Sequence, residues 1–132
     1  MEKQECKRFI RPVRDVIDLI GGKWKLPIII ALSFGNRRFK ELERQIEGIS
    51  PRMLSKELKD LEANGLVQRT VFNTMPVSVE YRLTDYGSTL DEVIVVMRQW
   101  GLRHRAKVMD QDTGQAGTES ENPMNEGTPK PV

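Results

Sequence analysis

The sequence predicts a mainly α-helical domain that carries one small β-hairpin. Between residues 13 and 63, four consecutive segments have the apolar spacing or the apolar content of helices. Residues 77–83 then alternate apolar and polar side chains, which is typical of a half-buried strand. A final segment returns to the helical spacing after residue 84. At 132 residues, the chain is long enough for one such domain with an ordinary core.

The first three predicted helices are delimited by proline and glycine. Val13–Ile20 has apolar residues at positions 13, 16, 17 and 20, and we expect this helix to begin at Pro12. Trp24–Gly35 is apolar on nearly every side, so we expect it to be buried, with Pro27 in its first turn. Asn36–Gly48 is predicted to form the third helix, because its apolar residues at 39, 42 and 46 share one face.

The fourth predicted helix follows at once and carries a basic face. Ser50 is a favourable N-cap, and Pro51 suits the first helical position, where no backbone N–H is needed. Gly65 can end the helix in the left-handed conformation. Leucines 54, 58 and 61 form one stripe, and the side chains nearly opposite to it include Arg52, Lys56 and Lys59. Because a base in the first turn opposes the helix dipole, Arg52 indicates that a partner outside the chain uses this charge.

A β-hairpin and a long helix are predicted after the basic helix. The strands are residues 66–72 and 77–83, with the sequence NTMP as the turn between them. Thr84, with Asp85 as the less favoured alternative, is expected to cap a helix that runs to about Lys107. This order of elements is that of a winged helix-turn-helix, in which the third helix braces the fourth, the fourth enters a DNA major groove and the hairpin is the wing.

The charge distribution divides the chain into three parts. We expect a charged N-terminal arm at residues 1–11, the winged helix-turn-helix domain at 12–109 and a disordered acidic tail at 110–132. The tail carries five acids and one base, a net charge of −4, so the whole-chain value of +2 leaves +6 on residues 1–109. A basic domain favours polyanionic partners, although this charge alone is a weak indication.

Several functional classes are disfavoured by what the sequence contains. The longest apolar run, Leu26–Leu32, is far too short to span a membrane, and the N-terminus shows no secretory signal. The single cysteine allows no intramolecular disulfide and is consistent with the reducing cytoplasm. With one cysteine and one histidine, and with no strand or GxGxxG pattern at Gly21-Gly22, we expect no metal site, no cofactor and no enzymatic activity.

Three segments carry a resemblance to a known family. The runs GGKWKLPII, RRFKELERQIEGISPRMLSKELKDLEANGLVQR and VEYRLTDYG, in this order and spacing, closely resemble the HxlR family of bacterial transcriptional regulators, relatives of the MarR proteins. The resemblance covers roughly residues 12–104. It implies a dimeric, cytoplasmic, DNA-binding regulator without enzymatic activity, whose subunits join through their terminal helices.

One departure from the family concerns redox sensing. Many members carry a cysteine directly before the proline that opens the first helix, and in several it senses oxidants or electrophiles, but here that position is Arg11. The only cysteine, Cys6, lies five residues earlier, near Lys3, Lys7 and Arg8. An unremarkable thiol is the simpler interpretation of Cys6, and a redox role is the alternative.

The sequence therefore predicts a sequence-specific transcriptional regulator, in the role of a repressor, that binds a pseudo-palindromic operator in double-stranded DNA as a homodimer. A small-molecule inducer is compatible with this interpretation, and a membrane partner is not expected. The alternative is a winged-helix protein-interaction module without sequence-specific DNA binding. The residues expected at DNA are Ser50, Arg52, Ser55, Lys56, Lys59, Arg37, Arg38, Lys40, Asn73 and Thr74. Those expected at the dimer interface are Val13, Val16, Ile17, Val93, Val95, Val96, Met97 and Trp100.

Three further side chains have open interpretations. Trp24 and Trp100 lie on apolar faces and are most simply core or interface residues, with a ligand pocket beside either as the alternative. His104, the only histidine, is expected at the surface near the end of the last helix.

Overall fold

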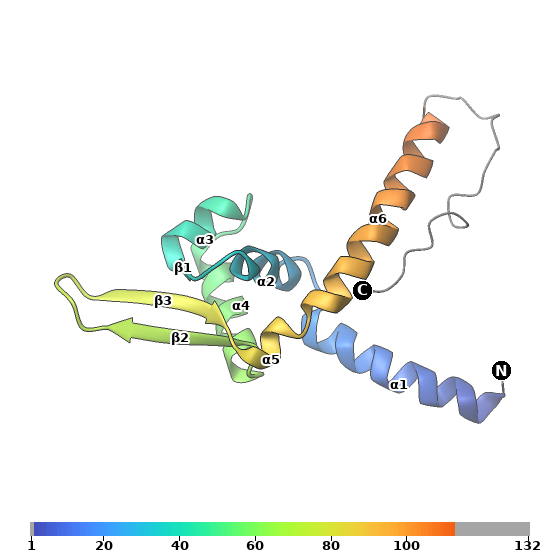
Figure 1. Cartoon of the computed structure of the whole chain (residues 1–132), viewed down its shortest axis with the longest axis horizontal. Helices are drawn as coiled ribbons and strands as arrows, with labels where there is room; N and C mark the ends of the chain where they lie inside the picture. The colour runs from blue at the N-terminus through green and yellow to red at the C-terminus, as the bar shows by residue number, and fades with distance from the viewer. Residues whose placement is uncertain (1, 113–132) are drawn as a thin grey trace. The chain divides into compact units, whose positions relative to one another are not determined.

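The computed structural model describes residues 2–112 and has the predicted class of fold (Figure 1). Its helices and strands are, in chain order, α1 (Lys3–Ile20), α2 (Lys25–Ser33), β1 (Arg37–Arg38), α3 (Phe39–Gln45), α4 (Pro51–Ala63), β2 (Val67–Phe72), β3 (Ser78–Leu83), α5 (Asp85–Ser88) and α6 (Asp91–Asp112). The chain divides into two units, residues 1–88 and 89–132. In the described part of the chain, no helix has the length and apolar character needed to cross a membrane.

The core of the first unit is built from the apolar faces of α2, α3 and α4. The three leucines of the α4 stripe are almost fully buried, as predicted, and Ile28 and Ile29 of α2 are completely so. The expectation that α2 is buried on every side is wrong, because Ile30 is 40% exposed and Phe34, just after the helix, is 78% exposed. Burial of the leucine stripe orients α4 and turns its opposite face outward.

A three-stranded antiparallel sheet, in the order β1-β3-β2, closes this unit. The predicted hairpin is confirmed, with a register that runs from Val67 opposite Leu83 to Phe72 opposite Ser78. Strand β1 was not predicted: Arg37 and Arg38 pair with Tyr81 and Glu80 of β3 instead of starting the third helix. A two-residue strand is too short to show a period in its sequence, so it can be recognised only from its pairing with β3.

Helix α1 begins much earlier than predicted. It starts at Lys3, so the expected start at Pro12 is wrong, and Pro12 lies inside the helix. Proline removes one helical hydrogen bond and is therefore unfavourable inside a helix. However, Phe9 and Ile10 lie three or four residues before Val13 and extend its apolar face toward the N-terminus. Residues 3–11 are therefore helical.

The predicted last helix is divided in two. Thr84 does cap a helix, since its Oγ1 accepts a hydrogen bond from Gly87 N at 2.9 Å, but that helix is the short α5. Gly87 and Ser88 are poor helix formers, and α6 begins separately at Asp91. At its other end α6 reaches Asp112, beyond the predicted end near Lys107 and into the predicted acidic tail. The rest of that tail, residues 113–132, lies outside the described residues.

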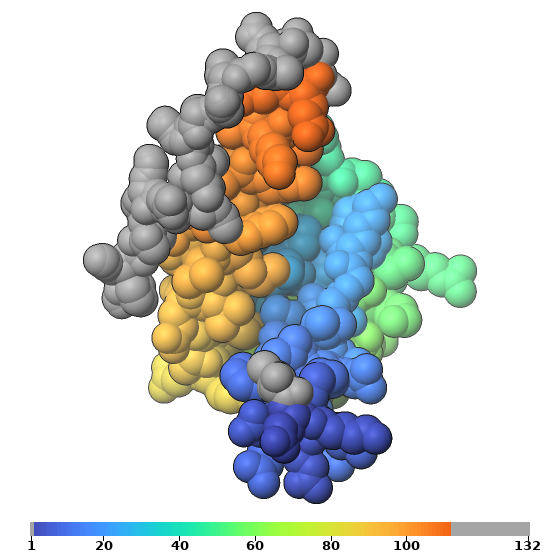
Figure 2. All heavy atoms as spheres, turned by 90° about the vertical axis from the view of Figure 1, so that its right-hand side faces the viewer, coloured from blue at the N-terminus to red at the C-terminus, as the bar shows by residue number. Residues whose placement is uncertain are grey.

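Both terminal helices carry exposed apolar side chains. On α1 the buried residue is Ile20, and the apolar side chains from Phe9 to Ile17 are all exposed. In Figure 2, α1 (blue) and α6 (orange) both contribute atoms to the surface seen in this view. All eight residues predicted for the dimer interface are exposed in the described chain: Val13, Val16, Ile17, Val93, Val95, Val96, Met97 and Trp100.

Candidate nucleic-acid interface

The outward face of α4 is basic, as its sequence predicts. Ser50 caps the helix, with its Oγ accepting a hydrogen bond from Met53 N at 3.1 Å. At the other end Gly65 adopts a φ of +76°, which suits glycine, and ends the helix. Between these ends Arg52, Lys56 and Lys59 are exposed on the side away from the core. The two caps thus hold a helix whose first turn presents a guanidinium to solvent.

The basic side chains line a shallow surface depression. It has a volume of about 380 Å³ and is lined by Arg52, Ser55, Lys56, Lys59 and Asp60. Within the described residues, neither Arg52 nor Lys59 takes part in an ion pair. Both cations are therefore free to meet an anionic partner, and nucleic-acid phosphates are one class of anion that exposed arginine and lysine side chains contact.

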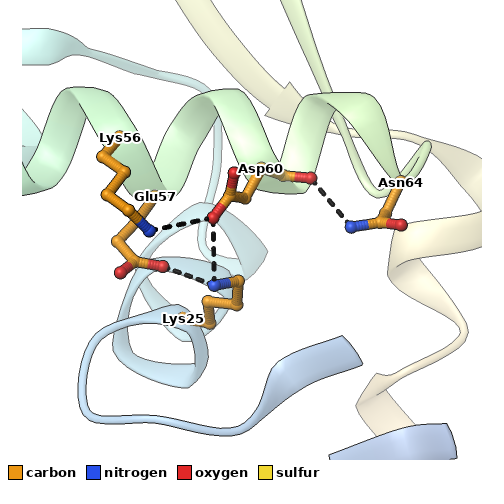
Figure 3. A network of polar contacts seen from close by, with 5 residues as sticks. All are labelled: Lys25, Lys56, Glu57, Asp60 and Asn64. Atoms are coloured by element: carbon orange, nitrogen blue, oxygen red, sulfur yellow. Dashed lines mark hydrogen bonds and ion pairs between the residues drawn. The ribbon is translucent and has the colours of Figure 1, made fainter. Parts of the chain in front are cut away.

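An ion-pair network joins α4 to α2 beneath this face (Figure 3). Lys25 Nζ lies 2.6 Å from Glu57 Oε1 and 3.5 Å from Asp60 Oδ2, and Lys56 Nζ lies 3.3 Å from the same Asp60 oxygen. The hydrogen bond from Lys25 to Glu57 raises the pKa of Lys25 above its ordinary value. The hydrogen bond from Lys56 lowers the pKa of Asp60. Both pKa shifts favour the charged forms of Lys25 and Asp60 at neutral pH.

The sequence analysis did not single out Glu57, which lies on α4, and did not find its partner. The structure shows Glu57 buried against Lys25, thirty-two residues away in another helix. Its position three residues after Leu54 puts it at the border of the leucine stripe, and that spacing was the signal that could have marked it as inward-facing. The identity of the partner depends on how α2 packs against α4, which no local pattern contains.

The bases near the start of α3 differ in how free they are. Arg37 is half-buried, and its Nε and Nη1 donate hydrogen bonds to Gln45 Oε1 at 3.2 Å and to Asn36 O at 3.0 Å. Arg38 and Lys40 are exposed, and the Arg38 backbone N donates to Glu41 Oε1 at 2.7 Å at the start of α3. Phosphate contacts thus stay a prediction that fits Arg38 and Lys40 better than Arg37.

The hairpin contains more charge than its turn suggests. Asn73 and Thr74 are exposed at the turn, where the Thr74 hydroxyl donates to Pro76 O at 2.7 Å. Behind the turn, Arg82 Nη2 donates to Gln68 Oε1 at 2.6 Å, and both residues are exposed. The sequence interpretation considered only the turn and missed Arg82. The alternation of residues 77–83 places position 82 on the polar face of its strand, which was the available signal.

The two tryptophans have different surroundings. Trp24 lines a depression of about 820 Å³ together with Pro27, Ile30 and Phe34, and the Lys23 ammonium lies 4.8 Å from the centroid of the Trp24 ring. Trp100 is 55% exposed and stacks on His104, with ring centroids 5.4 Å apart. Trp100 is therefore not a core residue. The depression beside Trp24 is the candidate for the ligand pocket that was considered as an alternative.

The possible redox and metal ligands in the part of the chain that the structure describes would be the single cysteine and groups of His, Cys, Asp and Glu side chains. Cys6 is exposed on α1. Residues 2–112 contain no group of three or more His, Cys, Asp or Glu side chains that could hold a metal ion.

Comparisons with known proteins find chains that are similar to this one in sequence and in fold. Residues 19–109 match the family model of the HxlR-like helix-turn-helix. The HTH-type transcriptional regulator YtcD of Bacillus subtilis is 38% identical over 104 residues, which cover 79% of this chain and 82% of YtcD. The regulator YybR of the same organism is 42% identical over 94 residues, covering 71% and 75%. Among solved structures, the reduced form of the redox regulator HypR superposes with a TM-score of 0.71 at 39% identity and covers 75% of this chain and 98% of its own.

Proposed function

Because the chain belongs to the HxlR family of helix-turn-helix transcriptional regulators, we propose that it is a cytoplasmic repressor that binds a pseudo-palindromic DNA operator as a homodimer. The observation that carries this proposal is the basic outward face of α4, capped at both ends and turned away from the leucine core. In helix-turn-helix proteins such a helix contacts base edges with its N-terminal residues. Arg52, Lys56 and Lys59 are the residues we assign to DNA on α4, with Arg38, Lys40 and the hairpin at flanking phosphates.

A mobility-shift experiment with genomic fragments tests this function. The purified full chain should retain a small set of fragments in the presence of excess random duplex, and footprinting should show two protected half-sites about one helical turn apart. Equal competition by random and genomic DNA would contradict sequence-specific binding. Absence of any shift at low salt would favour the alternative, a winged-helix module that binds proteins.

The proposed dimer uses the apolar surfaces of the two terminal helices. On α1 the exposed side chains of Phe9, Ile10, Val13 and Ile17 line a depression of about 420 Å³. On α6, Val95, Val96 and Trp100 are 43%, 54% and 55% exposed. Soluble monomers rarely expose contiguous apolar patches of this kind, and a stable dimer buries on the order of 1,200–2,000 Å². A second copy of the chain would supply that cover.

Charged substitutions on α6 are expected to dissociate the dimer. The double variant Val95→Glu, Val96→Glu places two carboxylates in the proposed interface, where burial without a partner is strongly unfavourable. Equilibrium sedimentation well above typical working concentrations, on the order of tens of micromolar, should show a dimer for the wild type and a monomer for the variant. A matched variant, Arg105→Glu, changes charge on an exposed position of the same helix and should stay dimeric. A monomeric wild type would contradict the proposed assembly.

Cys6 is not expected to act as the switch of this protein. It is exposed on α1, and the position at which other family members carry a sensor cysteine is Arg11. Cys6→Ser should retain operator affinity, and diamide should release neither version from DNA. Release of the wild type by diamide, with the serine variant unaffected, would contradict this prediction and make a disulfide between the two Cys6 residues of a dimer the leading mechanism.

A further inference from the structure

One acid lies within the basic face of α4. Asp60 lines the same depression as Arg52, Lys56 and Lys59, and its side chain is 43% exposed. A carboxylate at this place repels phosphates, so it opposes DNA binding in general. It also does little for the helix, because in the pair of Lys56 with Asp60 the base precedes the acid, the less favourable order along a helix. Neither general affinity nor helix stability explains this residue.

The contacts of Asp60 instead connect a mostly buried cation to an exposed one (Figure 3). Lys25, whose side chain is 15% exposed, is anchored by Glu57 and reaches Asp60 Oδ2 from the core side. Lys56, whose side chain is 63% exposed, reaches the same oxygen from the outer face. Lys25 thereby restrains the Asp60 carboxylate, and the same carboxylate forms an ion pair with the exposed Lys56 ammonium. Both the direction and the effective charge of Lys56 depend on this carboxylate.

We propose that Asp60 is a specificity-determining residue that positions Lys56 and masks its charge from DNA of arbitrary sequence. This inference rests on the proposed function. Arbitrary DNA is bound mainly through neutralisation of phosphates, so an ammonium that is already paired adds little to that binding. At the operator Lys56 meets a partner in a defined place, and an ammonium held in one orientation loses less side-chain entropy on binding. Removal of the carboxylate should therefore favour arbitrary DNA over the operator.

The test compares Asp60→Asn with Glu62→Gln in the full chain. Glu62 lies two residues further along α4, is exposed, and within the described residues has no ion-pair partner, so its variant changes the net charge equally without releasing Lys56. Affinity is measured for the footprinted operator duplex and for a scrambled duplex at several salt concentrations. For Asp60→Asn on the scrambled duplex, the slope of log K against log salt should steepen by about 0.9 for each Lys56 that engages a phosphate. The ratio of operator to scrambled affinity should fall.

Glu62→Gln should leave both the slope and the ratio near the wild-type values. In a Lys56→Gln background, Asp60→Asn should likewise have no larger effect than Glu62→Gln. Equal effects of the two acid variants in the wild-type background would overturn the inference, because net charge alone would then account for them. An unchanged ratio of operator to scrambled affinity in Asp60→Asn would also overturn it. A wild-type protein that binds operator and scrambled duplexes equally would instead contradict the proposed function. Both acids are on the exposed side of α4, and thermal unfolding of each variant checks that the fold is retained.

Discussion

Replacement of Arg52 by alanine is expected to weaken operator binding by roughly 1–3 kcal/mol for each contacted half-site, or about 5- to 150-fold. Arg52 is exposed in the first turn of α4, the part of a recognition helix that reaches base edges. Its planar guanidinium can pair with guanine O6 and N7, a bidentate contact that lysine cannot make. Preference for one base pair of each half-site should relax together with the affinity.

Lys59→Ala is the matched comparison for this prediction. Lys59 is exposed two turns further along α4, where we expect the helix to rise toward the groove wall and the ammonium to meet a phosphate. Its removal should weaken operator and scrambled duplexes about equally and reduce the salt slope by about one per contact. Binding isotherms on both duplexes at several salt concentrations distinguish the two behaviours. Wild-type operator affinity in Arg52→Ala would mean that the first turn of α4 does not contact bases.

Replacement of Lys25 by methionine is expected to lower the free energy of unfolding by roughly 3 kcal/mol, the lower end of the range for a broken buried ion pair. The Lys25 and Glu57 side chains are 15% and 11% exposed, and their charged atoms are 2.6 Å apart. Without Lys25, the Glu57 carboxylate stays largely buried and loses its cation. Urea unfolding of wild type and variant at one protein concentration measures the difference.

The double variant Lys25→Met, Glu57→Met distinguishes loss of the ion pair from the cost of leaving the Glu57 carboxylate buried without a cation. Apolar replacement of a whole buried pair is often neutral, so most of the lost stability should return.

The contribution of the Lys25–Glu57 pair to stability also depends on pH. Because pairing raises the pKa of Lys25 above its ordinary value of 10.5, its contribution is fully present below pH 10.5 and is lost as pH rises through the raised pKa. A difference between wild type and Lys25→Met that shrinks between about pH 7 and 9 would contradict this assignment.

Much of the candidate site could be predicted because α4 follows local rules. The cap at Ser50, the end at Gly65 and the opposition of leucines and bases each depend on residues within a few positions of one another. The start of α1 was mispredicted for the same local reason, since Pro12 is usually a boundary and here lies inside a helix. Local rules state preferences, and a continuous apolar face can outweigh one of them.

The sequence by itself determined the order of the main helices and of the β-hairpin, the caps of α4 and the outward position of Arg52, Lys56 and Lys59, because periodicity and capping act between near neighbours along the chain. Only the tertiary structure decided that Arg37 and Arg38 form a strand, since β3 supplies their hydrogen-bonding partners. It alone also joined Lys25 to Glu57 and, through Asp60, to Lys56. These contacts bring together residues far apart in the chain, and their geometry is set by the packing of α2 against α4.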